Sequence, residues 1–133
     1  MSSMEYFDFD TQEWLYLSSC NKARKYGGLS AMTKSTKKLY LGGGDHATQC
    51  VEVYDFEANQ WYNLPATQLP HRYYPNLWTD ENENILYISC SYSNSIESLD
   101  LRSNESSWNV MCGADVFPTH SLGLDYNQFR SVL

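Results

Sequence analysis

The sequence predicts an all-β chain built from repeated units, on the strength of three observations. Tryptophan recurs at intervals of 47 residues, as Trp14, Trp61 and Trp108. Short runs of β-branched and aromatic residues alternate with clusters of Gly, Asn, Asp and Ser, which is typical of strands joined by turns. Apolar residues at helical spacing are nearly absent. A repeat of this length is typical of solenoids and propellers.

The strands of each unit can be placed by the same offset. An acidic and apolar phrase that ends in aspartate precedes each tryptophan. The three phrases are Glu5-Tyr6-Phe7-Asp8, Glu52-Val53-Tyr54-Asp55 and Glu97-Ser98-Leu99-Asp100. An earlier run, Leu39–Gly43, returns 47 residues later as Leu86–Cys90, and Arg24 and Arg72 precede a further run at nearly the same spacing. Each complete unit therefore contains four strand-like runs.

We expect a single domain over residues 1–133, with two complete units between two half units. The half units span about residues 4–18 and 119–133. The complete units span about residues 24–65 and 72–112.

Apolar residues lie on both faces of one expected strand, since Val51, Val53, Tyr54 and Phe56 alternate little with polar residues. Both faces of such a sheet must be covered. The small sheets of a propeller meet this condition because each sheet packs between two neighbours. The pattern therefore favours small antiparallel sheets stacked around a central axis.

At these positions the chain resembles the kelch family, whose repeat has a glycine doublet ending one strand, a Tyr-Asp pair in the next and a tryptophan shortly afterwards. The middle unit supplies Gly42-Gly43, Tyr54-Asp55 and Trp61. The resemblance implies a kelch-type β-propeller of four-stranded antiparallel blades. Its structural repeat positions would be Gly42, Gly43, Tyr54, Asp55, Trp14, Trp61 and Trp108. A WD-repeat propeller fits less well, because none of the four tryptophans is followed by aspartate.

The last complete unit departs from the kelch pattern. Ser89-Cys90 stands where the glycine doublet is expected, and Ser98-Leu99 replaces the expected Val and Tyr. The interval from Asp100 to Trp108 is two residues longer than its counterpart in the middle unit. We therefore expect a longer turn there.

The number of blades leaves three arrangements open. A closed propeller usually has at least about four blades, and this chain contains fewer than three complete ones. The chain is a fragment of a longer propeller, or the half units of two chains complete each other in a symmetric dimer of six blades, or the half units pair within one small ring. We therefore expect a propeller that is incomplete in one chain or completed by dimerisation.

The kelch resemblance also implies a partner-binding rim, because in that family the loops before the first strand and after the glycine doublet line the central channel. The rim would consist of Arg24, Tyr26, Asp45, His46, Arg72, Tyr73, Tyr74, Tyr92, Asn94 and His120. Arginine binds carboxylates through a planar fork and tyrosine offers a large contact area, so this rim suits an acidic peptide. A structural interpretation remains open, in which Arg24 and Arg72 tie loops together and Tyr73 or Tyr74 packs against proline.

Two classes of function follow from the resemblance. The first is a non-catalytic protein–protein interaction module, either the substrate-recognition part of a kelch-type ubiquitin ligase receptor or a scaffold. The ligase role requires an adaptor segment outside these residues. The second is a carbohydrate-binding or sugar-modifying kelch-type propeller enzyme, in which Trp78, Tyr73 and Tyr92 would stack on sugar rings.

Charge and composition argue against several other classes. The chain has 9 Lys and Arg against 16 Asp and Glu, and this formal charge of −7 argues against nucleic-acid binding through phosphate contacts. No apolar run is long enough to cross a membrane, so no membrane association is expected. The N-terminus lacks the basic and apolar regions of a secretory signal, and we expect a cytoplasmic protein.

The sequence carries no signature of catalysis, of a cofactor or of a metal site, and we expect none of the three. The run Gly42–Gly44 is not followed by Lys-Ser/Thr, no Gly-x-Ser-x-Gly elbow occurs, and the three histidines are widely separated. The cysteines form no C-x-x-C pair; they are Cys20, Cys50, Cys90 and Cys112. We expect reduced thiols, although an even number also permits two disulfides.

Overall fold

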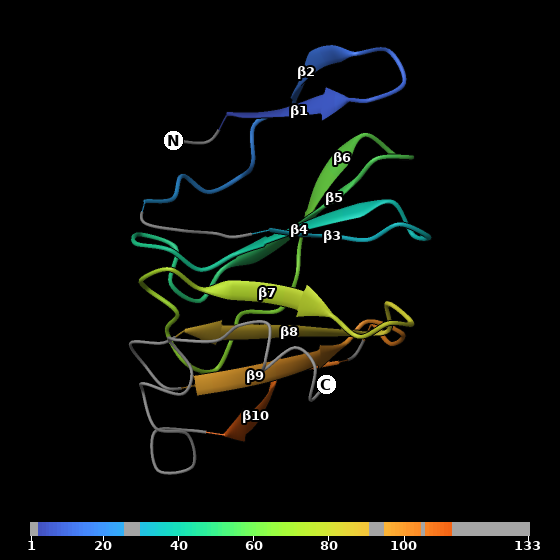
Figure 1. The fold of residues 1–133 in the computed structure, drawn as a ribbon. Coiled ribbons are helices and arrows are strands. Elements are labelled where there is room, and N and C mark those ends of the chain that lie inside the picture. Colours follow the sequence, from blue (N-terminus) through green and yellow to red (C-terminus); the bar gives the residue numbers. More distant parts are fainter. Residues whose placement is uncertain (1–2, 26–29, 91–94, 105, 113–133) are drawn as a thin grey trace.

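Every regular element is a β-strand in the computed structural model, which describes residues 3–25, 30–90, 95–104 and 106–112. These strands form one two-stranded and two four-stranded sheets, and all pairings are antiparallel between strands that follow one another in the chain. The prediction of an all-β chain with antiparallel sheets is therefore confirmed over the described residues. The three sheets lie one above another in the order of the sequence (Figure 1).

The three sheets are formed by successive segments of the chain. The first hairpin comprises β1 (Met4–Asp8) and β2 (Glu13–Leu17). The middle sheet comprises β3 (Ser30–Met32), β4 (Lys38–Gly42), β5 (Val51–Asp55) and β6 (Gln60–Asn63). The third sheet comprises β7 (Asn76–Thr79), β8 (Ile85–Cys90), β9 (Ser95–Asp100) and β10 (Asn109–Cys112). The offset of 47 residues therefore corresponds to one sheet.

The aspartate that ends each phrase shapes the turn that follows it. The Oδ1 atom of Asp55 accepts hydrogen bonds from the backbone N–H groups of Glu57, at 2.9 Å, and Ala58, at 3.1 Å. Asp8 and Asp100 accept backbone N–H groups of their own turns in the same way. An aspartate at the start of a turn can replace the backbone as an acceptor, which explains why this residue type recurs.

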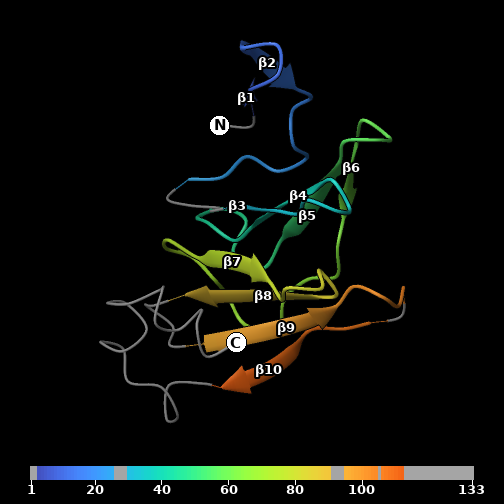
Figure 2. The same ribbon diagram turned by 45° about the vertical axis from the view of Figure 1, so that its right-hand side comes forward.

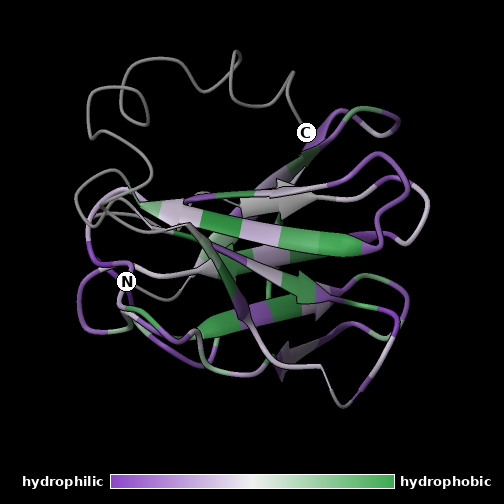
Figure 3. Cartoon of the chain, turned by 90° about the horizontal axis from the view of Figure 1, so that it is seen from below, coloured by the Kyte–Doolittle hydropathy of each residue, from purple (hydrophilic) through white to green (hydrophobic). Residues whose placement is uncertain are grey.

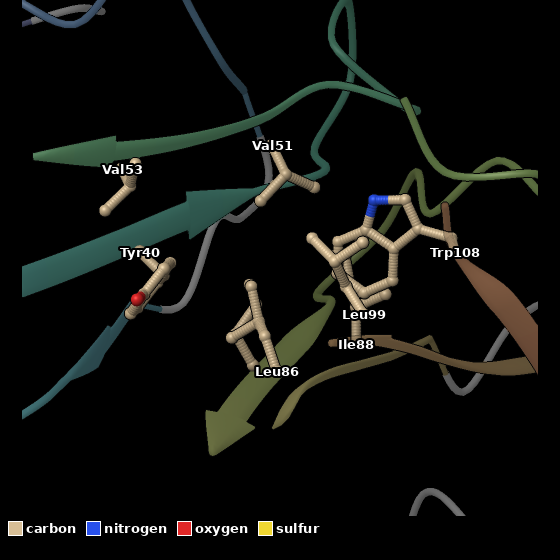
Figure 4. Close-up of a cluster of buried hydrophobic side chains, with 8 residues drawn as sticks. Tyr40, Val51, Val53, Leu86, Ile88, Leu99 and Trp108 are labelled. Carbon is tan, nitrogen blue, oxygen red and sulfur yellow. The ribbon is translucent and has the colours of Figure 1, made fainter. Parts of the chain in front are cut away.

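The middle sheet is covered on both faces. One face packs on the third sheet through a cluster of buried side chains (Figure 4), which comprises Tyr40, Val51, Val53, Leu77, Leu86, Ile88, Leu99 and Trp108. The other face packs on the first hairpin through a smaller cluster, which comprises Leu17, Leu39 and Tyr54 with Met4, Tyr6, Phe56 and Trp61 around them. This double coverage explains the weak polar alternation of the middle unit. Hydrophobic residues accordingly lie mainly in the strands and hydrophilic residues mainly in the connecting loops (Figure 3).

The recurring tryptophans tie each sheet to the segment that leads into it. The indole N–H of Trp61 donates to the carbonyl oxygen of Ser18, and that of Trp108 donates to the carbonyl oxygen of Pro65, both at 2.7 Å and both across 43 residues. A buried indole N–H requires such an acceptor. Trp14 differs from both, because 67% of its surface is exposed.

The second view shows the hairpin at one end of the stack, with the middle sheet on one side of it (Figure 2).

Candidate functional site

The loops at one end of the sheets form the candidate site, which we call the loop end and define as residues 18–25, 43–50 and 64–75. Hydrogen bonds hold these segments together. The backbone N–H of Gly44 donates to the carbonyl oxygen of His71 at 2.8 Å. The backbones of Lys25 and Asp45 exchange two hydrogen bonds, of 2.6 and 3.3 Å. The strands carry these loops to the same edge of the molecule, on the left in Figure 1.

The glycine doublet permits this close approach of two loops. Gly43 has a φ angle of +70°, and a Cβ atom at this position would lie 2.6 Å from the carbonyl oxygen of His71 and 2.7 Å from a ring carbon of Pro75. A side chain therefore has neither the backbone conformation nor the space that it needs. Gly42 is less restricted, since the nearest atom to its Cβ position is a methyl group of Val51 at 3.1 Å.

Arg24 lies inside the protein rather than on an exposed rim. Its Nη2 group donates to Oε2 of Glu52 at 2.6 Å, and the side chains of the two residues are 4% and 0% exposed. Its Nη1 group donates to the carbonyl oxygen of Gly43 at 3.3 Å. Glu52 also accepts the backbone N–H of Asn21 at 2.6 Å. Arg24 thus ties the entering segment to the middle sheet and to the glycine loop.

The third sheet repeats this arrangement with histidine in place of arginine. Glu97 is fully buried and accepts the backbone N–H of Gln68 at 2.7 Å. Its Oε2 atom lies 2.5 Å from Nε2 of His71, which is also fully buried. Gln68 and His71 each lie 47 residues after their counterparts in the preceding unit. The structure therefore matches Arg24 with His71, and the match of Arg24 with Arg72 made from the sequence is wrong.

Arg72 is an exposed arginine of the loop end. Its Nε–H donates to Oδ1 of Asp45 at 2.8 Å, and its side chain is 55% exposed. The guanidinium carbon lies 5.0 Å from the centre of the Tyr73 ring, within the range of a cation–π contact. The hydrogen bond from Arg72 lowers the pKa of the Asp45 carboxyl group. Asp45 and Tyr73 thus both contact an arginine that faces solvent.

His46 and Tyr74 flank this arginine on strained backbone. Their φ angles are +70° and +47°, and both residues are exposed. Such angles cost about 1–3 kcal/mol in residues other than glycine and recur at functional sites. Nε2 of His46 lies 3.8 Å from Oδ2 of Asp45, so the two side chains are neighbours. The loops thus hold two large polar side chains outward at an energetic cost.

A shallow hollow begins beside His46. It has a volume of about 380 Å³, and its lining includes Lys22, Gln49, Cys50 and Leu64. Its walls combine apolar surface with amide and ammonium groups at the edge. The hollow therefore offers room for the side chain of a bound segment beside His46.

The structure thus brings together five of the ten expected rim residues. They are Asp45, His46, Arg72, Tyr73 and Tyr74. Arg24 is adjacent but buried. The other four lie outside the described residues; they are Tyr26, Tyr92, Asn94 and His120.

Trp78, considered above as a sugar-stacking residue, lies in the interior. Only 5% of its surface is exposed, and its ring stacks on that of Tyr87 at 5.4 Å and 12°. A sugar ring cannot reach this face without displacing Tyr87. The sequence analysis quoted Glu52 and Glu97 in the recurring segments but gave them no role. The spacing of 47 residues from Asn21 to Gln68 and from Arg24 to His71 was a signal that could have identified their partners.

The described part of the chain offers few groups for metal binding or for nucleophilic chemistry. Within it, no three His, Cys, Asp or Glu residues gather in a way that could hold a metal ion. Among the described residues, Cys50 is a free thiol. Burial raises the pKa of the Cys20 and Cys50 thiols, which disfavours the reactive thiolate.

No protein-family model matches the chain, and no curated protein matches it. Among the described residues there is no helix with the length and apolar character needed to cross a membrane.

Proposed function

We propose that the chain is a non-catalytic protein–protein interaction module of the kelch-propeller type, and that its loop end binds a peptide carrying carboxylate groups. The observation that carries this proposal is the geometry of Arg72, which contacts both Asp45 and Tyr73 while it remains exposed to solvent. A cytoplasmic scaffold and the substrate-recognition part of a ubiquitin ligase receptor both require such a surface.

Two features support the kelch-type fold. Each four-stranded sheet contains strands in sequential order, as a propeller blade does. The glycine doublet of the middle sheet lets the loop after β4 approach the loop before β7, through the hydrogen bond between Gly44 and His71. Both loops belong to the set that lines the channel in the kelch family.

The free donors of Arg72 define the ligand chemistry. A guanidinium group has five N–H donors, and among the described residues Arg72 uses its Nε–H for Asp45. The N–H groups on Nη1 and Nη2 can therefore form a bidentate hydrogen-bonded contact with a carboxylate, for which arginine is better suited than lysine. Tyr73 and Tyr74 supply neighbouring aromatic surface.

A binding titration tests the proposal. We would screen a pool of fluorescent peptides rich in Asp and Glu against matched peptides in which Asn and Gln replace the acids. We expect binding of acidic peptides that weakens at least about tenfold in Arg72→Ala, since a hydrogen bond to a charged group contributes roughly 1.5–3 kcal/mol. Arg72→Lys should restore only part of the affinity.

Arg102→Ala provides a matched control. Arg102 is also exposed and also paired, with Asp100 at 2.7 Å, but it lies in the turn after β9 at the opposite end of the sheets. This variant should bind acidic peptide like the parent chain. Equal binding by Arg72→Ala would contradict the site, and binding of glycans with no peptide bound would favour the carbohydrate class of function.

A further inference from the structure

The first hairpin exposes an aromatic face at the end of the stack. In the register of the hairpin, Phe7 pairs with Trp14 and Glu5 pairs with Tyr16, so these four side chains share one face, which we call the outer face. The alternate residues of β1 pack on the middle sheet, so the outer face points away from it. Trp14 is 67% exposed and Tyr16 is 78% exposed. Phe9 extends the patch and is 85% exposed. Exposed aromatic surface of this extent indicates an interaction site.

The rings of the outer face already have the arrangement of a covered face. The rings of Phe7 and Phe9 meet edge to face at 5.1 Å, and those of Phe7 and Trp14 lie 5.4 Å apart at 60°. The counterparts of these three residues, 47 positions later, are Tyr54, Phe56 and Trp61. In that set the first pair is 5.0 Å apart and edge to face, and the second is 5.2 Å apart at 56°. The outer face is therefore preorganised for a similar contact.

The corresponding face of the middle sheet shows what such a surface binds. The indole N–H of Trp61 donates to the carbonyl oxygen of Ser18. Glu52 accepts the backbone N–H of Asn21 and a guanidinium N–H of Arg24, both at 2.6 Å. The carbonyl, the amide and the cation thus come from positions three residues apart in one segment.

The third sheet binds the segment before it at the same spacing. The indole N–H of Trp108 donates to the carbonyl oxygen of Pro65. Glu97 accepts the backbone N–H of Gln68 at 2.7 Å, and its other carboxylate oxygen lies 2.5 Å from Nε2 of His71. Two sheets therefore use a tryptophan and a glutamate to hold a carbonyl, an N–H three residues later and a basic side chain three residues after that.

The outer face presents the same two groups without burying them. Trp14 occupies the repeat position of Trp61. Glu5 occupies that of Glu52, but Glu5 is exposed and Glu52 is fully buried. A hydrogen bond to Glu5 raises the pKa of the Tyr16 hydroxyl group, so these two side chains are in contact. A carboxylate has about four acceptor sites, and the bond from Tyr16 leaves others available to a ligand.

The charge of the hairpin favours a cationic ligand. Residues 4–17 contain four acidic residues and neither Lys nor Arg. These carboxylates attract cationic groups. Arginine suits the outer face better than lysine, because its guanidinium can bind a carboxylate through two N–H groups and stack on an aromatic ring. The rings of Phe7 and Trp14 lie on the same face as Glu5.

We infer that the outer face binds an extended segment of a partner protein through a backbone carbonyl, an N–H three residues later and an arginine three residues after that. The carbonyl accepts the indole N–H of Trp14, and the other two groups bind Glu5. The exposed rings cover the apolar stem of the arginine. This surface lies on the hairpin and is independent of whether the loop end binds acidic peptide.

A peptide copied from the chain itself tests the inference. Its sequence is that of residues 18–25 with Cys20→Ser, so it keeps the carbonyl, the N–H and the arginine at the required spacing. Fluorescence anisotropy of the labelled peptide, titrated with the parent chain, should show saturable binding. The same peptide with Arg24→Gln should bind at least about tenfold more weakly, because it loses a hydrogen bond to a charged group.

A scrambled peptide of the same composition is the matched control for charge. It keeps the three cations of the probe and loses the spacing of the bound groups. We expect its dissociation constant to be at least about tenfold higher. Equal binding of the scrambled peptide would mean attraction by charge alone and would overturn the inference.

Variants of the hairpin locate the contact. Glu5→Gln and Trp14→Ala should each raise the dissociation constant of the probe peptide at least about tenfold. Both residues are exposed, so both variants should keep the circular dichroism spectrum of the parent chain. Glu13→Gln removes an exposed acid at the start of β2, outside the outer face, and should bind like the parent chain. Unchanged binding by Glu5→Gln or by Trp14→Ala would contradict the site.

Hydrogen exchange distinguishes the outer face from the chain's own covered face. The probe peptide should protect residues 4–17. Protection confined to residues 51–63 would mean that the peptide displaces the chain's own segment from the middle sheet, and it would overturn the inference. A probe peptide that fails to bind at any concentration would overturn it as well.

Discussion

At the scale of single residues, Arg24 and Arg72, the two arginines that the sequence analysis matched with each other, have opposite roles. The charge of Arg24 is buried against Glu52. The charge of Arg72 faces solvent beside Asp45. A buried charge that loses its partner is costly, whereas an exposed pair contributes little to stability. Arg24 is therefore a structural residue, and Arg72 is the one that can be used for binding.

Replacing each arginine by methionine should separate these roles. Arg24→Met leaves the carboxylate of Glu52 buried without its cation, and we expect a loss of about 3–5 kcal/mol in the free energy of unfolding. Arg72→Met should change it by less than about 1 kcal/mol. Urea unfolding followed by tryptophan fluorescence measures both. Similar losses in the two variants would contradict the assignment of Arg24 to the interior.

Gly43 should tolerate substitution less well than its neighbour. Gly43→Ala adds a methyl group 2.6 Å from the carbonyl oxygen of His71, at a φ of +70°, and we expect a loss of about 2–4 kcal/mol from backbone strain and overpacking. Gly42→Ala meets only the Val51 methyl group at 3.1 Å, which a small shift relieves. Thermal unfolding of the two variants provides the comparison. Equal stability of Gly43→Ala and the parent chain would show that the loops do not approach in this way.

At the scale of elements, a turn of the third sheet is clamped to a turn of the middle sheet. Glu83 precedes β8 and accepts the backbone N–H groups of Lys34, at 2.6 Å, and of Ser35 and Thr36, both at 3.2 Å. It also accepts the hydroxyl of Ser35. These hydrogen bonds lower the pKa of the Glu83 carboxyl group, and the bond from the Ser35 hydroxyl has the largest effect. The clamp is strongest while the carboxylate is ionised.

The Glu83 clamp should therefore weaken in acid. Because folding lowers this pKa below its ordinary value of 4.5, the stabilisation is present above that value and disappears as the pH falls through the folded-state pKa. Glu83→Gln should melt below the parent chain at pH 7, and the difference should shrink as the pH approaches 3. Glu81→Gln, which alters an exposed acid nearby, should show no such difference. A melting difference for Glu83→Gln that stays constant with pH would contradict the clamp.

The strands were predictable because their signals are local. The aspartates shape turns through hydrogen bonds to residues two or three positions away. Trp61 and Trp108 bond to segments 43 residues earlier, and their regular spacing made them recognisable in the sequence. The loop end was only partly predictable. Alignment by residue type chose Arg72 as the counterpart of Arg24, whereas the structure places His71 there. His71 contacts the buried Glu97 as Arg24 contacts the buried Glu52, so the third sheet has the same contact with a different residue type.

At the scale of the whole molecule, one kind of interface is used repeatedly. The hairpin packs on the middle sheet, and the middle sheet packs on the third sheet, with a tryptophan N–H linking each four-stranded sheet to the segment before it. The stack ends in Trp14 on one side and Met111 on the other, both exposed.

The central claim is that the loop end is a binding surface for acidic peptide. Hydrogen exchange of the parent chain, with and without a saturating acidic peptide from the screen, tests this claim most directly. We predict new protection in residues 43–48 and 70–75, and unchanged exchange in residues 101–104 at the opposite end. Protection confined to the opposite end, or no change in either segment with the peptide bound, would contradict the claim.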